Sequence, residues 1–147
     1  MEDSRLLIKK KTALSKVKRN LEQFKSFELI DIIEAKSEEI SNYREQIEEL
    51  NHYSYPKLAV RKLNKSSEIM IEWFFKEVSI LKDNSTWAMP FDEMGIWWVK
   101  VKVINCKQAI KELWAIGEIC IIEQETKKCF YIQIEEDNCY IVFKQLQ

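Results

Sequence analysis

The chain is poor in the residue types on which many active sites depend. Its 147 residues include a single histidine, His52, two glycines and two prolines. A catalytic triad needs a histidine beside a nucleophile and an orienting acid, and phosphate-binding loops need closely spaced glycines. These shortages argue against triad hydrolases and against nucleotide-binding loops. We therefore expect a non-enzymatic protein with no catalytic residues.

Long apolar runs are also missing from the chain. The longest is about five residues, whereas a membrane-spanning helix needs about 20 consecutive apolar residues. The N-terminus has no apolar segment of signal-peptide length, and its lysines follow the short apolar patch. We therefore expect a cytoplasmic protein without a membrane partner.

Four cysteines lie in the last third of the chain, at Cys106, Cys120, Cys129 and Cys139. Their spacings contain no Cys-x-x-Cys pair, the arrangement typical of zinc sites and redox motifs. In a cytoplasmic protein we expect them to be reduced and buried as small hydrophobic residues. With so few histidine and cysteine ligands at suitable spacing, we predict no metal ion and no cofactor.

The feature that stands out is a reversal of charge within the first fifty residues. Residues 1–25 carry eight basic side chains against three acids, and residues 26–50 carry eight acids against two basic side chains. Both segments have apolar residues at helical spacing. We predict two helices, at 4–24 and 26–50, with Ser26 capping the second, which pair as an antiparallel hairpin. A continuous helix that dimerises as a coiled coil is the alternative geometry.

In the remainder of the chain, the spacing of the apolar residues changes near residue 84 from a helical to a strand-like period. Residues 66–83 are apolar around most of a helical circumference, which predicts a buried central helix. From residue 97 onward, alternating and continuous apolar runs with one short helical segment predict a β-α-β-β-β order. Residues 57–63 fit either a short strand or a helical turn.

These elements indicate an α+β fold. It comprises an N-terminal antiparallel helical hairpin, a buried central helix and a small, mostly antiparallel sheet. We place a boundary between a charged hairpin, residues 1–52, and a small α+β domain, residues 53–147, and expect the two to pack as one unit.

A surplus of aromatic side chains lies near the start of the predicted sheet. Alternation places Trp98 on the same strand face as Lys100 and Lys102. Aromatic residues beside basic ones are typical of binding hot spots, so we predict a partner-binding site at Trp87, Phe91, Trp98, Lys100 and Lys102. Packing of the aromatic residues in the core, and stacking on nucleic-acid bases, remain alternatives.

The basic N-terminal helix is a second candidate site. Basic side chains can neutralise phosphates or acidic protein surfaces. The residues concerned are Lys9, Lys10, Lys11, Lys16, Lys18 and Arg19. Because they nearly encircle the helix and the acidic segment would repel phosphate, self-pairing is the alternative.

Residues 90–103 loosely resemble the metal-binding core of the PD-(D/E)xK nucleases. In that family an Asp precedes a strand that carries an acid, one spacer residue and a Lys. The resemblance assigns the outer positions to Asp92 and Lys102, but Lys100 stands where the central acid belongs. A cation at a ligand position repels a metal ion, so the resemblance implies at most a degenerate member of that fold.

We predict from these features a non-enzymatic interaction protein. It would bind a protein partner stoichiometrically, as an inhibitor, an immunity or antitoxin-like factor, an adaptor or an assembly factor does, or would self-associate through its N-terminal helices. A nucleic-acid-binding regulator is the alternative.

Overall fold

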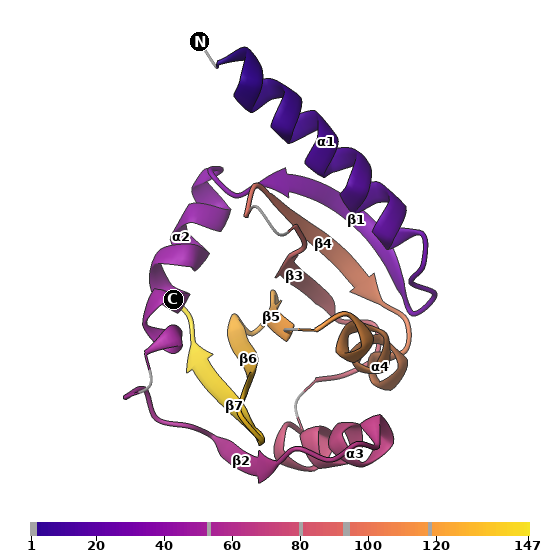
Figure 1. The fold of residues 1–147 in the computed structure, drawn as a ribbon, viewed down its shortest axis with the longest axis vertical. Helices are drawn as coiled ribbons and strands as arrows, with labels where there is room; N and C mark the ends of the chain where they lie inside the picture. The colour runs from indigo at the N-terminus through magenta and orange to yellow at the C-terminus, as the bar shows by residue number, and fades with distance from the viewer. Residues whose placement is uncertain (1–2, 53, 80, 93–94, 118) are drawn as a thin grey trace.

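The computed structural model describes residues 3–52, 54–79, 81–92, 95–117 and 119–147, and its fold is α+β (Figure 1). The described helices are α1 (Ser4–Leu21), α2 (Glu38–Ile47), the 3-10 helix η1 (Glu48–Asn51), α3 (Ser67–Glu77) and α4 (Cys106–Ile116). The described strands are β1 (Phe27–Glu34), β2 (Ala59–Lys62), β3 (Thr86–Pro90), β4 (Trp97–Val103), β5 (Ile119–Glu123), β6 (Lys128–Glu135) and β7 (Asn138–Gln145).

The seven described strands form one antiparallel sheet in the order β1-β4-β3-β5-β6-β7-β2. The predicted β-α-β-β-β order is confirmed by β4, α4, β5, β6 and β7. The prediction of a small sheet was wrong, because β1, β2 and β3 join these four strands. Of the two readings of residues 57–63, the strand is the correct one.

The predicted N-terminal helical hairpin was wrong. The first helix, α1, is present, but residues 27–34 form the strand β1, which pairs with β4 along its whole length. The β-branched residues Ile30, Ile32 and Ile33 favour a strand. Ser26 caps no helix and instead precedes β1, whereas Ser37 caps α2 by accepting a hydrogen bond from the Ile40 amide at 3.4 Å.

Helices cover both faces of the sheet, and each face has its own apolar core. On one face, α3, α4 and the C-terminal half of α1 pack over a core that includes Phe74, Trp87 and Ile110. On the other face, α2 and η1 pack over a core that includes Ile40 and Trp98. Figure 1 shows α2 across the sheet from α3 and α4. The sheet also contains strands from both sides of residue 52, where we placed the domain boundary.

Helix α3 is less central than its composition predicted. Met70, Ile71 and Phe74 are buried, but Ile69 is 39% exposed, so α3 has one buried face and one face toward solvent. The helix ends at Glu77, earlier than predicted. Residues 80 and 118, which we assigned to this helix and to the following sheet, lie outside the described residues.

Candidate functional site

Helix α1 is packed against the body of the protein at one end. Its buried residues, Ala13 and Val17, lie in its C-terminal half. In the N-terminal half Leu6 is 43% exposed, Leu7 44% and Ile8 65%. Figure 1 shows this end of α1 extending past the sheet. Three consecutive apolar side chains therefore face solvent on a projecting helix.

Polar and aromatic contacts hold α1 in place. The indole Nε1 of Trp97 donates to the Lys10 carbonyl at 3.1 Å, and Lys10 Nζ donates to Glu34 Oε1 at 2.9 Å. Just beyond the helix, Phe24 stacks on Phe27 with ring centroids 4.8 Å apart. The hydrogen bond from Lys10 holds the pKa of Glu34 below its ordinary value, with Lys36 adding to the effect and burial opposing it.

A groove of about 300 Å³ runs between α1 and the end of β3. Apolar side chains line much of it, and polar or charged side chains complete the lining. The residues of this α1 groove are Ile8, Lys9, Thr12, Ala13, Lys16, Val17, Asn20, Phe91 and Asp92. A second cavity of about 440 Å³ shares Asn20, Phe91 and Asp92 with it and reaches Ile116, which is 61% exposed. Together they form an extended, largely apolar depression.

The charge around the α1 groove is predominantly basic. Residues 4–21 contain seven Lys or Arg and no acid. Of the six basic residues that we singled out in the sequence, Lys10 is engaged with Glu34, and the others are exposed: Lys9, Lys11, Lys16, Lys18 and Arg19. Two of these, Lys9 and Lys16, border the groove.

The Asp92 carboxylate organises the loop beside the groove. Its Oδ2 accepts hydrogen bonds from the amides of Ile96 at 3.1 Å and Trp97 at 2.9 Å. These bonds connect the end of β3 to the start of β4. Asp92 therefore has a structural role that accounts for its position.

The predicted aromatic site is divided among three environments. Trp87 and Trp98 are 0% and 3% exposed and belong to the cores on opposite faces of the sheet. Phe91 is partly exposed in the α1 groove. Trp98 does share its face with Lys100 and Lys102, as alternation predicted, but α2 covers the indole. Of the three aromatic residues, only Phe91 has surface to offer a partner in this arrangement.

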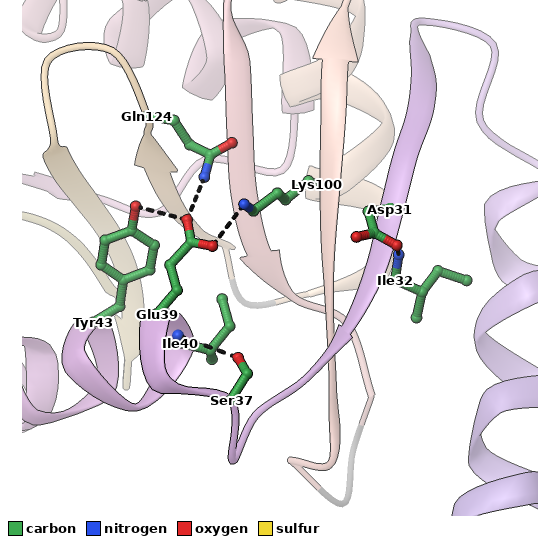
Figure 2. Close-up of polar contacts among 8 residues, drawn as sticks. All are labelled: Asp31, Ile32, Ser37, Glu39, Ile40, Tyr43, Lys100 and Gln124. Carbon is green, nitrogen blue, oxygen red and sulfur yellow. Dashed lines mark hydrogen bonds and ion pairs between the residues drawn. The ribbon is translucent and has the colours of Figure 1, made fainter.

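Lys100 is held by an acidic residue of α2 (Figure 2). Glu39 accepts hydrogen bonds from Lys100 Nζ at 2.7 Å, from Gln124 Nε2 at 3.1 Å and from the Tyr43 hydroxyl at 3.4 Å. Lys144 of β7 likewise pairs with Glu49 of η1. Two of the five acids of residues 38–49 thus pair with lysines of the sheet, and α1 lies on the opposite face. Lys102 is exposed.

The residues of the nuclease resemblance do not come together. Asp92 borders cavities on the face covered by α1 and α4, whereas Lys100 and Lys102 point to the α2 face. Among the residues that the structure describes, no three His, Cys, Asp or Glu side chains are grouped so that they could hold a metal ion.

The four cysteines are buried in the protein, and the single histidine lies at its surface. All four cysteines are reduced and buried, as predicted. Burial raises the pKa of Cys106 to about 12, with nearby Asp83 adding to the effect, and burial raises that of Cys139 to about 11. His52 is exposed at the C-terminal end of η1.

Comparisons with protein-family models, curated proteins and solved structures found no significant match. None of the helices in the described ranges is both long and apolar enough to cross a bilayer.

The α1 groove was not predicted from the sequence, because we assigned the helical stripe through Leu7, Leu14 and Val17 to a hairpin interface. Leu6 and Ile8, which lie beside that stripe, were the available signal.

Proposed function

We propose that the protein acts by stoichiometric binding of another protein at the α1 groove. One observation carries this proposal: the 65% exposed Ile8 lines an apolar groove beside a helix that carries seven basic residues and no acid, and Leu6 and Leu7 are exposed at the same end of that helix. Contiguous exposed apolar surface with a polar rim is typical of protein interaction sites. It fits the non-enzymatic interaction protein that the sequence predicted.

The occupant that fits this surface best is an amphipathic helix with acidic flanks. Apolar side chains of such a helix would pack on Ile8, Ala13 and Phe91, in the helix-in-groove mode. Its carboxylates would face Lys9 and Lys16 at the rim. Complementary charge of this kind directs orientation and association rate more than it adds affinity.

A protein partner is favoured over nucleic acid by the apolar part of the site. Phosphate backbones are held by charge, and such binding weakens steeply with salt. Ile8 and Phe91 of the groove would gain nothing from a phosphate backbone, whereas an apolar helix face would bury them. The nucleic-acid alternative remains an outcome of the same experiment.

The test compares three fluorescently labelled probes by anisotropy. They are a helical peptide with leucines on one face and glutamates on its flanks, the same peptide with lysines on its flanks, and a random-sequence DNA duplex. We expect the glutamate-flanked peptide to bind at 1:1 stoichiometry and more tightly than the other two. Ile8→Ser should weaken it at least tenfold, and Lys9→Glu with Lys16→Glu should weaken it further.

Ile134→Ser is the matched control, because Ile134 is an exposed isoleucine on β6, outside the groove lining. It should leave peptide binding unchanged. Equal binding of both peptides, or equal effects of Ile8→Ser and Ile134→Ser, would overturn the proposal. Tighter binding of the duplex, lost steeply with added salt, would replace it with the nucleic-acid function.

A further inference from the structure

The two edge strands of the sheet differ sharply in charge. β1 and β2 stand at opposite ends of the strand order, and within the described residues β1 pairs with β4 alone and β2 with β7 alone. The outer side of each strand therefore has no strand neighbour in the described part of the chain. Such edges are templates for a further strand unless their side chains prevent pairing.

The β1 edge is acidic and apolar. Four consecutive residues, Glu28 to Asp31, are exposed, with Leu29 at 47% and Ile30 at 55%. The strand contains three acids and no basic residue. It thus exposes apolar side chains between carboxylates.

The β2 edge is basic and apolar. Leu58, Val60 and Leu63 are 48%, 54% and 38% exposed. Residues 50–67 contain four basic side chains and no acid, and Arg61 and Lys62 lie in the strand itself. This edge is the charge complement of β1.

The charges also lie on matching faces of the sheet. Glu28 and Asp31 stand opposite Lys102 and Lys100 in the ladder, on the face that α2 covers. Lys62 shares that face, because its neighbour Arg61 stands opposite Cys139, which belongs to the other core. β1 and β2 point in the same direction, because six antiparallel pairings separate them. If β1 of one copy added parallel to β2 of another, the two sheets would keep the same faces, and Lys62 would come out on the same side as the two acids.

We propose that the chain self-associates head to tail, with β1 of one copy adding to β2 of the next. Pairing two β1 edges would set acids against acids, and pairing two β2 edges would set basic residues against basic residues. Like charges on opposed strands are destabilising. Only the unlike pairing joins complementary edges, and repeating such a heterologous contact forms a ring or an open chain.

Both strands limit the length of the proposed contact between β1 and β2. β2 has four residues. β1 has an irregular register between Leu29 and Asp31, and the Asp31 carboxylate accepts a hydrogen bond from the Ile32 amide at 2.9 Å (Figure 2). The exposed stretch of β1 before Ile32 is therefore about as short as β2. A contact of this length is weak, so self-association should depend on protein concentration.

The inference goes beyond the α1 groove and is tested separately by sedimentation equilibrium in low salt. We expect the weight-average mass to rise with concentration above the monomer mass of 17.7 kDa. Glu28→Lys with Asp31→Lys should keep the chain monomeric, and so should Arg61→Glu with Lys62→Glu. The variant with all four reversals should associate again, because its edges are complementary once more. Circular dichroism would verify that each variant is folded.

A charge-matched control is Glu45→Lys with Glu48→Lys, which alters exposed acids of α2 and η1 and should leave association unchanged. Ile8→Ser should also leave it unchanged, whereas a loss there would locate self-association at the N-terminal helix and overturn the proposal. The proposal would also be overturned if the wild type were monomeric at every concentration. The same holds if the wild type associated but the variant with all four charge reversals stayed monomeric.

Disulfide trapping gives a second readout that does not depend on charge reversal. Glu28 and Val60 lie on the same face of the sheet on opposite edges. A mixture of a Glu28→Cys copy and a Val60→Cys copy should form a mixed disulfide faster than either variant forms one with itself. Equal rates would contradict head-to-tail pairing.

Discussion

Lys10 of α1 and Glu34 at the end of β1 form an ion pair, with Nζ and Oε1 2.9 Å apart. The Lys10 carbonyl also accepts the indole N–H of Trp97. One residue thus joins the helix both to the edge strand and to its neighbour β4. The opposed charges of the first fifty residues do meet here, but the acid belongs to a strand and not to a second helix.

Removing the Lys10 charge should raise the pKa of Glu34. In Lys10→Met the aliphatic stem is largely retained while the hydrogen bond is lost, and a carboxyl titration by NMR should record the rise. The pair should contribute about 0.2–1 kcal/mol, as partly exposed pairs do. Because folding lowers this pKa from its ordinary value of 4.5, the contribution is present above about pH 4.5 and disappears as the pH falls and the carboxylate is protonated.

Lys11→Met serves as the control for this titration, because Lys11 is an exposed neighbour on the same helix. It should leave the Glu34 titration almost unchanged. Equal shifts in both variants would mean that general helix charge, and not the Lys10 contact, sets the pKa.

Phe74→Ala should lower the free energy of unfolding by about 3–5 kcal/mol, since truncation of a buried Phe leaves a cavity. The Phe74 side chain is 0% exposed in the core that α3 and α4 share with the sheet. Urea denaturation measures the loss. Ile69→Ala, at a 39% exposed position of the same helix, should cost clearly less. Similar losses in the two variants would contradict the assignment of the buried face of α3.

Asp92→Ala should destabilise the protein by about 1–3 kcal/mol, because two backbone amides lose their acceptor. Those amides belong to Ile96 and Trp97. Asp92→Asn retains an acceptor oxygen and should cost less, and Glu45→Ala, at an exposed position of α2, should cost almost nothing. Urea denaturation again provides the measurement. Magnesium-dependent DNA cleavage that both Asp92 variants abolish would contradict this structural role and support the nuclease resemblance.

The native protein should react slowly with a thiol reagent at pH 8. Burial raises the pKa of Cys106 to about 12 and that of Cys139 to about 11, so both remain protonated, and the thiolate is the reactive form. Cys120 and Cys129 are buried as well. Absorbance from an aromatic disulfide reagent should show four equivalents after unfolding in guanidinium and far slower reaction before it. Rapid reaction of any thiol in the folded state would contradict the placement of that cysteine.

Elements with local signals were predicted well. Asn105 caps α4 by accepting the Gln108 amide at 3.0 Å, and an Asn three residues before a Gln is a local capping pattern that can be read in the sequence. Gly117 follows that helix with a φ of +124°, a conformation that residues with a Cβ rarely adopt. The alternation that predicted β4 also placed Trp98 and Lys100 on one face. In each case the signal lies within a few residues of the structure that it specifies.

The candidate site was predicted only in part. The basic residues of α1 and Phe91 were singled out, but Trp87 and Trp98 were grouped with them because the sequence does not reveal which helix covers which strand. Residues 27–34 were assigned to a helix because Leu29, Ile33 and Ile40 share a heptad spacing. The cluster of isoleucines and the capping Ser37 were contrary signals that this assignment left out.

The sequence by itself determined an α+β chain with a basic first helix, a capped α4 and a meander of strands after it, because these depend on contacts between near neighbours. Only the tertiary structure decided that β1 joins β4, that α2 buries Trp98, and that an acidic and a basic strand form the two edges of one sheet. Those outcomes depend on pairing between segments some 60 to 80 residues apart, where burial of whole faces outweighs local helix or strand preference.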